Sequence, residues 1–272
     1  GAMRPILAIL LLLSSPLIRA GGEDLPMGAR FAGMGYSGLA LSDLWSIRLN
    51  PAGLAALEVP AAGIFYQQHF LSPDLAHQGL AVAIPLGKGT LGIGADRFGY
   101  SLYNQSKGSL GYAMRFGESI RVAVQFDYLS VRLGENYGSA SAFTAEIGMQ
   151  AKLTDQLWVG AHAYNLNKAK IGGPYDETIP TILRAGLVYT FSPKFLLTAD
   201  VEKDIDRGEQ FRFGAEYHPN SVLFLRTGIS TGPVQGHFGA GIRYKKLDID
   251  LALAVRSQLG ATPMIGLTYR FK

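Results

Sequence analysis

The chain ends on the stretch Ala-Thr-Pro-Met-Ile-Gly-Leu-Thr-Tyr-Arg-Phe, residues 261–271, one position before its last residue. Side chains of an extended strand point alternately to its two faces. One face of this stretch therefore carries Ile265, Leu267, Tyr269 and Phe271, and the other carries Met, Gly, Thr and Arg. Lipid surrounds a bacterial outer-membrane barrel and its lumen tolerates polar groups, so a stretch of this kind is typical of the last strand of such a barrel.

The same alternation repeats along the chain from Pro60 onward. Fourteen segments of alternating polarity are separated by turn residues. They span residues 60–71, 76–86, 88–99, 105–116, 118–132, 139–153, 155–168, 180–192, 194–205, 208–218, 221–231, 235–246, 247–257 and 261–271. Tight turns, such as Gly87-Lys88, alternate with longer loops, of which the longest runs from Asn167 to Pro180. The pattern predicts an all-β fold: a 14-stranded antiparallel transmembrane β-barrel over residues 60–272, with both termini in the periplasm.

A soluble β-sandwich is the alternative for a chain of repeated short strands. A sandwich does not require two classes of loop that alternate along the chain, nor so many apolar outward faces, so the barrel is favoured. Trp158 and Phe224 fall on the polar faces of their segments. Two explanations stay open for them: they lie at the membrane interface, or the register assumed for their strands is shifted by one residue.

The composition fits an exported membrane protein without metal or nucleic-acid chemistry. The 272 residues include no cysteine, which excludes disulfides and thiolate metal sites, and the five histidines show no spacing typical of a metal site. The formal net charge of +4 is spread out, with Lys245-Lys246 as the only basic pair after residue 20. We therefore expect no cofactor, no metal and no nucleic-acid partner.

The first 20 residues differ from the rest of the chain. Met3 and Arg4 precede an apolar run over residues 6–13, and the small residue Ala20 stands before Gly21-Gly22. A basic start, a short apolar core and a small residue are typical of a secretory signal peptide, and the run is too short to span a membrane as a helix. We expect residues 1–20 to be a signal peptide and the protein to reach the bacterial outer membrane.

Residues 21–59 do not alternate in polarity. They combine glycines, turn residues and one arginine, namely Gly28, Arg30, Gly33, Gly35, Asn50, Pro51, Ala52 and Gly53. Asn-Pro favours a turn and the glycines permit tight backbone geometry. The segment is sized for one or two short helices and a bend. We expect it to fold into the periplasmic mouth of the barrel as a hatch, or plug.

Two motifs in this segment carry a resemblance to a known superfamily. The run Gly-Ala-Arg-Phe-Ala-Gly-Met-Gly at residues 28–35 is followed by Leu-Asn-Pro-Ala-Gly-Leu at residues 49–54. Together they resemble the N-terminal hatch of FadL-like outer-membrane barrels, which have fourteen strands, and look most similar to the compact PorV/PorQ-type proteins of the Bacteroidetes group. The resemblance implies an outer-membrane location and a hatch around Asn50, Pro51 and Ala52.

The resemblance also implies a function. PorV/PorQ-type proteins are accessory or carrier subunits of protein secretion or assembly machines such as the type IX secretion system. It therefore implies a non-enzymatic subunit that contacts outer-membrane lipid and other barrel or lipoprotein subunits. The alternative is a FadL-like passive transporter of hydrophobic small molecules through a lateral gap in the wall. An inward kink in an early strand, at Gly92 or Gly94, would favour that alternative.

Charged residues on the predicted inner faces are the candidate lumen contacts. They are Glu146, Asp200, Glu202, Arg212, Glu216, Arg243, Asp248, Asp250, Arg256 and Arg270. These residues either form a polar pathway and bind Arg30, Asp43 and Arg48 of the hatch, or pair with one another in a filled lumen. Mutual pairing is favoured, because an unpaired charge in a confined lumen is costly.

An enzymatic site has weak support in the sequence. His69 lies three residues before Ser72, with Asp74 nearby. Nucleophilic catalysis requires a serine, a base and an acid that converge in space, and such a spacing is common by chance. A loop turn explains these residues more simply, so no catalytic residue is expected.

Overall fold

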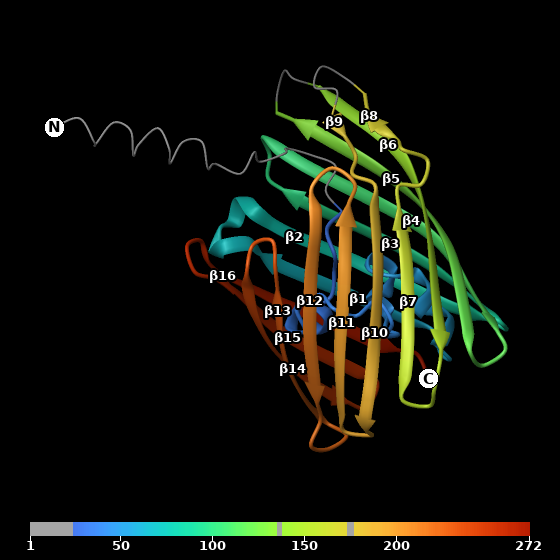
Figure 1. Ribbon diagram of the computed structural model, residues 1–272. Coiled ribbons are helices and arrows are strands. Elements are labelled where there is room, and N and C mark those ends of the chain that lie inside the picture. Colours follow the sequence, from blue (N-terminus) through green and yellow to red (C-terminus); the bar gives the residue numbers. More distant parts are fainter. Residues whose placement is uncertain (1–23, 135–137, 173–176) are drawn as a thin grey trace.

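The computed structural model describes residues 24–134, 138–172 and 177–272; the predicted signal peptide lies outside them. In the described residues fourteen strands close into one antiparallel barrel, in which each strand pairs with its neighbours along the chain and β1 pairs with β16 (Figure 1). The barrel strands are β1 (Ala61–Gln68), β2 (Ala76–Leu86), β3 (Gly89–Gly99), β4 (Tyr103–Phe116), β5 (Ile120–Leu133), β6 (Ser139–Lys152), β7 (Leu157–Tyr164), β10 (Ile182–Ser192), β11 (Phe195–Asp204), β12 (Gly208–Tyr217), β13 (Leu223–Ser230), β14 (Gln235–Tyr244), β15 (Leu247–Arg256) and β16 (Gly260–Arg270).

The predicted fold class is confirmed, and each of the fourteen predicted segments overlaps one barrel strand. The alternating polarity of every segment explains this result. Only a closed barrel gives each strand one lipid-facing and one inner face and also pairs every strand edge. The short strands β8 (Lys170–Ile171) and β9 (Glu177–Thr178) form a separate hairpin in the connection between β7 and β10.

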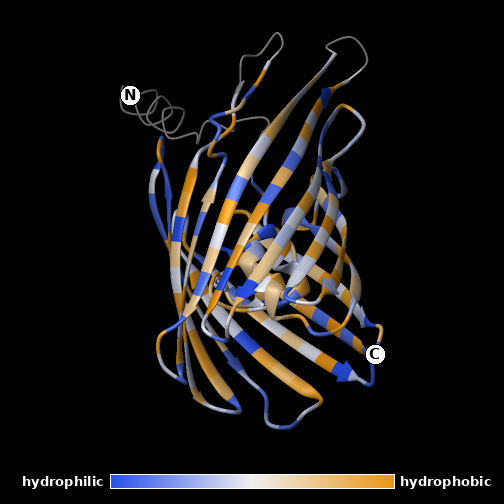
Figure 2. Cartoon of the chain, turned by 90° about the vertical axis from the view of Figure 1, so that its right-hand side faces the viewer, coloured by the Kyte–Doolittle hydropathy of each residue, from blue (hydrophilic) through white to orange (hydrophobic). Residues whose placement is uncertain are grey.

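The outer face of the barrel is apolar. Leu110, Phe126 and Phe143 occupy outward positions on β4, β5 and β6, and their exposed fractions are 54%, 59% and 68%. Orange and blue segments alternate along the strands in Figure 2. Such exposure is unfavourable in water and is expected where lipid covers the wall, so the barrel has the surface of a membrane-spanning protein. Within the described residues, no helix is long and apolar enough to cross a membrane.

The two ends of the barrel differ in their connections. Turns such as Gly87-Lys88, between β2 and β3, lie at one end, which we call the short-turn end; the C-terminus lies there too (Figure 1). The other end, the long-loop end, carries the β1–β2 connection with the 3-10 turns η3 (His69–Leu71) and η4 (Pro73–Leu75), and the β8–β9 hairpin.

Residues 24–59, which we call the inner segment, lie inside the barrel (Figure 2). They contain the helix α2 (Ala29–Gly33) and two 3-10 helices, η1 (Leu44–Arg48) and η2 (Pro51–Ala56). Asp43 caps η1, because its side chain accepts a hydrogen bond from the Trp45 N–H. Phe31 and Trp45 are 0% and 1% exposed, so the main apolar core of the molecule lies between this segment and the wall.

Neither explanation offered for Trp158 and Phe224 is correct. Both rings stand at lumen-facing positions, since Trp158 lies on the same strand face as buried Gly160 of β7, and Phe224 on the same face as buried Arg226 of β13. The Arg121 guanidinium lies 3.9 Å from the Trp158 ring centroid. Cation–π contacts of this kind make an aromatic side chain compatible with a charged lumen.

Candidate functional site

The inner segment approaches the wall most closely at glycines. An added Cβ at Gly33 of α2 would lie 3.0 Å from the Gly239 Cα on β14. Gly35 has φ +69°, and an added Cβ there would lie 3.0 Å from the carbonyl oxygens of Phe213 and Ile229. Only glycine combines this backbone conformation with such an approach. These positions therefore fix the segment against β12, β13 and β14.

The Asn-Pro motif forms the bend between η1 and η2. The Asn50 side chain accepts a hydrogen bond from the Ala52 N–H at 3.2 Å and donates one to the Leu39 carbonyl at 2.9 Å. Pro51 occupies the first turn of η2, where a missing N–H has no cost. Gly53 packs against the Ser46 side chain, where an added Cβ would lie 2.5 Å from Oγ. The bend is thus held by its own side chains.

Arg30 joins the inner segment to the wall near the short-turn end. Its guanidinium binds Glu216 of β12 at 2.9 Å and Asp43 at 3.1 Å. Glu216 also accepts from Arg226 at 2.7 Å, and Arg226 binds Asp250 at 2.6 Å. The negative charges of Glu216 and Asp43 outweigh burial and raise the pKa of Arg30 above its ordinary value. The predicted residues Arg30, Asp43, Glu216 and Asp250 thus belong to one ion-pair network. Arg226, which was not predicted, links Glu216 to Asp250.

A second connection lies on the opposite side of the lumen. The buried Arg48 guanidinium binds Asp96 of β3 at 2.5 Å and also donates to Ser109 of β4. Asp96 in turn binds the Nε2 atom of His77 at 2.8 Å. Arg48 was an expected hatch contact, whereas Asp96 and His77 were not predicted.

Asp24 is held between two cations of the wall. Its carboxylate binds Lys107 of β4 and Arg184 of β10, each at 2.8 Å. Burial alone would raise the pKa of Asp24, but the charges of Lys107 and Arg184 outweigh it and hold that pKa well below its ordinary value. Arg184 also binds Glu202 at 2.7 Å, and Glu202 binds Arg212 at 2.9 Å.

The remaining predicted lumen residues lie at different depths. Glu146 is buried and binds His162 Nε2 at 2.9 Å. Asp248 binds Arg243 at 3.0 Å and Arg270 at 3.2 Å at the short-turn rim. Arg256, at the far end of β15, forms no ion pair with any described residue. Sequence reasoning missed Asp24, Lys107 and Arg184; inward parity on β4 and β10 was the available signal for the last two.

The strand pairing is unbroken at Gly92 and Gly94, where a kink would have favoured the transporter alternative. Over residues 89–99, β3 pairs with β2 and with β4 without a break in register. An added Cβ at Gly92 would lie 2.6 Å from Leu54, and one at Gly94 would lie 3.1 Å from Ile47. These glycines give room to the 3-10 helices of the inner segment instead of bending the strand.

A cavity of about 280 Å³ lies in the lumen at the long-loop end, and we call it the long-loop cavity. Leu25, Pro26 and Tyr36 of the inner segment form one side of it. Residues of β1, β2 and β12–β16, together with η3, complete the lining, which includes Gln67, His69, Phe70, His77, Arg212, His237, Ala254 and Met264. Its lining mixes aromatic, apolar and hydrogen-bonding groups, which is the usual character of a small-molecule site.

A second lumen cavity, of about 380 Å³, lies at the short-turn end, and we call it the short-turn cavity. Its charged lining residues are Arg30, Asp43, Arg226, Arg243, Asp248 and Asp250. Each of them takes part in an ion pair with another protein side chain. The charged groups of this cavity are therefore already paired within the protein.

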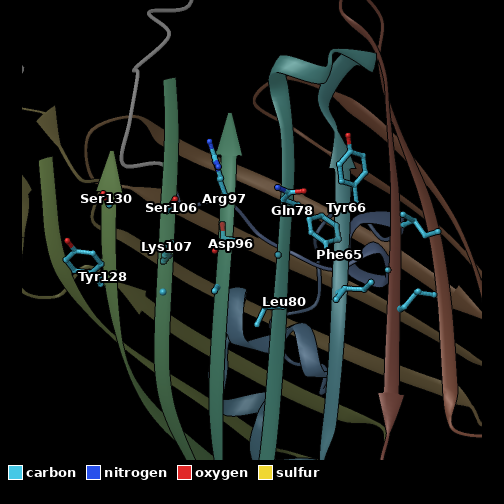
Figure 3. A pocket seen from close by; sticks show the side chains of 17 residues that line it. Phe65, Tyr66, Gln78, Leu80, Asp96, Arg97, Ser106, Lys107, Tyr128 and Ser130 are labelled. Carbon is cyan, nitrogen blue, oxygen red and sulfur yellow. The ribbon is translucent and has the colours of Figure 1, made fainter. Parts of the chain in front are cut away.

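A trough of about 700 Å³ lies on the outer face of the wall across β16 and β1–β5, and we call it the outer trough. Figure 3 shows Tyr66, Gln78, Leu80 and Arg97 around it, on β1, β2 and β3. Its floor includes Gly108 of β4, where an added Cβ would meet nothing within 4 Å. The trough and the long-loop cavity share strands β1 and β2, since Tyr66 and Gln78 line the trough whereas Gln67 and His77 line the cavity.

The three residues considered for catalysis do not form a triad. Ser72 precedes η4, and its N–H donates to the His69 carbonyl at 3.0 Å. No hydrogen bond links the side chains of His69, Ser72 and Asp74, which all lie in the described β1–β2 connection. Among the described residues no cluster of three or more His, Asp or Glu is placed to hold a metal ion.

Several solved structures have a fold similar to that of this chain. No protein-family model matches the sequence, and no curated protein matches it. A mutant form of the monoaromatic hydrocarbon channel TodX has a TM-score of 0.74 and 13% identity, over 90% of this chain and 99% of that one. The Pseudomonas putida toluene transporter TodX gives 0.68 and 14%, over 92% and 98%. A Pseudomonas aeruginosa FadL homologue gives 0.67 and 11%, over 93% and 100%. At these identities the likeness shows the fold alone.

Proposed function

We propose that the protein is a passive channel of the bacterial outer membrane that takes up a small, single-ring molecule. The long-loop cavity carries this proposal. A cavity of ~150 Å³ lined by apolar side chains is enough to bind benzene, and this one has about 280 Å³. Solved proteins with this fold are described as a monoaromatic hydrocarbon channel and a toluene transporter, which supports a single-ring substrate.

In this proposal residues 21–59 act as the hatch, the short-turn end and both termini face the periplasm, and the long-loop end faces outward. Four ion pairs support the hatch role, because they join the inner segment to the wall at Asp24, Arg30 and Arg48. A buried ion pair is costly to break when one partner is left alone. With the hatch in place, the bound molecule leaves sideways into the outer trough. This route requires β1, β2 and β3 to separate transiently, since their pairing has no break in register.

Uptake of toluene by cells that produce the protein tests the proposal. Ala254→Trp fills the long-loop cavity from β15, where Ala254 faces inward and is 5% exposed. Leu253→Trp is the matched control, since Leu253 is the preceding residue and faces outward. We expect Ala254→Trp to reduce uptake to the level of cells without the protein and Leu253→Trp to retain it. Equal uptake by cells with and without the wild-type protein would contradict the proposal.

An accessory subunit of a protein secretion or assembly machine, of PorV/PorQ type, is the second candidate. The outer trough favours it, because an apolar recess on a barrel wall also suits the side chains of a neighbouring membrane protein. Extraction of the tagged protein in mild detergent, followed by mass spectrometry, separates the two. Large outer-membrane partners in stoichiometric amounts support the subunit role, whereas an isolated barrel supports the channel.

A further inference from the structure

The long-loop cavity is more polar than a plain hydrocarbon requires. Three histidines line it, and each has one buried ring nitrogen without a partner in the described structure; two of them, His69 from η3 and His77 from β2, contact Phe98. These two rings pack edge-on against Phe98, with centroid distances of 5.5 Å and 6.4 Å. Their unpartnered atoms are Nε2 of His69 and Nδ1 of His77, and the third is Nδ1 of His237. Buried polar atoms are rarely left unpaired, so these atoms point to a missing partner.

The partners of His77 assign its tautomer. Its Nε2 atom lies 2.8 Å from the Asp96 Oδ2 atom. An ionised carboxylate can only accept hydrogen bonds, so His77 Nε2 carries the proton. In an imidazole with its hydrogen on Nε2, Nδ1 is an acceptor, and it has no partner among the described residues. The His77 side chain lines the cavity, so a donor inside the cavity is the partner nearest to this acceptor.

The partners of His69 assign the same tautomer, with the proton on Nε2, but leave the other ring nitrogen, Nε2 instead of Nδ1, without a partner. Tyr36 donates its hydroxyl hydrogen to the Gln67 Oε1 atom at 3.3 Å, which leaves the Gln67 amide nitrogen as a donor. That nitrogen lies 3.5 Å from the His69 Nδ1 atom, a long hydrogen bond in which Nδ1 accepts. His69 Nε2 therefore carries the proton and is a free donor. Of these two rings, His69 offers a donor and His77 an acceptor to the same cavity.

We propose that the long-loop cavity binds a hydroxylated single-ring aromatic molecule, a phenol, through its hydroxyl group. The hydroxyl oxygen accepts from His69 Nε2 and the hydroxyl hydrogen is donated to His77 Nδ1. The aromatic ring packs against the apolar part of the lining, which includes Phe70, Ala254 and Met264. This inference rests on the proposed function, since it names the substrate class of that channel.

Two probes of nearly equal size test it, para-fluorophenol and para-fluorotoluene, which differ by a hydroxyl in place of a methyl group. Fluorine NMR titrations on the detergent-solubilised full chain give a dissociation constant for each. We expect para-fluorophenol to bind about tenfold more tightly, since a net hydrogen-bond contribution of this kind corresponds to about one power of ten. Equal binding, or tighter binding of para-fluorotoluene, would overturn the inference.

His77→Phe keeps an aromatic ring and removes the acceptor, and Asp96 retains Arg48 as a partner. It should abolish the preference for para-fluorophenol and leave para-fluorotoluene binding within about twofold. His69→Phe, in the connection outside the strands, gives the same test if His77→Phe does not fold. His218→Phe is the control, because His218 lines the short-turn cavity. A preference that survives both His77→Phe and His69→Phe would contradict the inference.

Failure of this inference and failure of the proposed function give different results. If para-fluorotoluene binds and toluene uptake is observed without any preference for the phenol, the proposed channel function is supported and the proposed phenol substrate is wrong. If neither probe binds and cells show no uptake above background, both are wrong.

Discussion

The two lumen cavities differ in how the protein satisfies their polar groups. In the short-turn cavity every charged lining residue, from Arg30 to Asp250, pairs with another side chain. In the long-loop cavity His69, His77 and His237 each keep a buried ring nitrogen without a partner among the described residues. Polar groups that pair with one another have no need of a ligand, whereas buried groups without a partner can bind one. In the proposed function, the short-turn half therefore anchors the hatch and the long-loop half binds the transported molecule.

Of the variants considered, Arg30→Ala should lower the free energy of unfolding most, because it breaks ion pairs of the short-turn cavity. Arg30→Ala leaves Asp43 without its ion-pair partner and Glu216 with Arg226 alone. Loss of one partner of a buried pair costs about 3–5 kcal/mol, so the free energy of unfolding in urea should fall by that amount. Arg243→Ala is the control, since Arg243 is 47% exposed and its pair with Asp248 should contribute less than ~1 kcal/mol. Equal losses would show that the Arg30 network does not hold the inner segment.

Alanine variants at two glycines with the same backbone conformation distinguish the cost of a steric clash with the wall from the cost of backbone strain. Gly35 has φ +69° and faces backbone atoms of the wall, whereas Gly117 has φ +68° and an added Cβ would meet nothing within 4 Å. Both alanine variants bear the strain of positive φ, but only Gly35→Ala also forces the inner segment away from the wall. We expect it to lose about 2–3 kcal/mol more in urea unfolding than Gly117→Ala. Similar losses would mean that the close approach at Gly35 is unimportant.

Lowering the pH should reduce the free energy of unfolding, because His69 at the long-loop end is buried without charge. Burial, with a smaller contribution from His77, lowers the pKa of His69 to about 4. The unfolded chain takes up this proton near pH ~6.5, so the stabilisation is complete above that pH and is lost as pH falls toward 4. The loss should be roughly 2 kcal/mol, allowing for the part of the ring that meets solvent. Unfolding of wild type and His69→Phe across this range measures it, and parallel curves would contradict the assignment.

The smallest effect is expected at Phe224. Its ring stacks on His218 at a centroid distance of 4.9 Å and lies 5.0 Å from the Arg243 guanidinium. Phe224→Leu should cost about 1 kcal/mol in unfolding free energy, because the cation–π contacts are lost and most apolar volume is kept. Phe238→Leu, at a position 57% exposed on the outer face, is the control and should cost less.

The barrel was predictable from the sequence because its alternation is local. Each strand shows a two-residue period regardless of its partner, so the strand number and the chain order follow without knowledge of contacts. The prediction fails where local geometry overrides the pattern. The segment expected over residues 155–168 ends at Tyr164, because Asn165 adopts φ +55° and its side chain binds the backbone of Ala169 and Ile179.

The lumen was predictable only in part, because its contacts are non-local. Inward parity places Glu216 and Asp250 correctly on the inner face, but nothing in the sequence shows that Glu216 binds Arg30, 186 positions away. Gly92 and Gly94 were considered as the place of a possible kink, because glycine serves bending and close packing equally well. Only the position of Leu54 and Ile47 reveals that packing is their role.

The most direct test of the account is the lateral route from the long-loop cavity into the outer trough. Gly108→Phe fills the trough from an outward position with free space around it, and Gly236→Phe places the same side chain on β14, where an added Cβ is 3.9 Å from Phe238. Toluene uptake by cells producing each variant decides the matter. The account predicts that Gly108→Phe reduces uptake at least about tenfold, the change expected when about 1.4 kcal/mol is lost, while Gly236→Phe matches wild type. Full uptake through Gly108→Phe would contradict the lateral route.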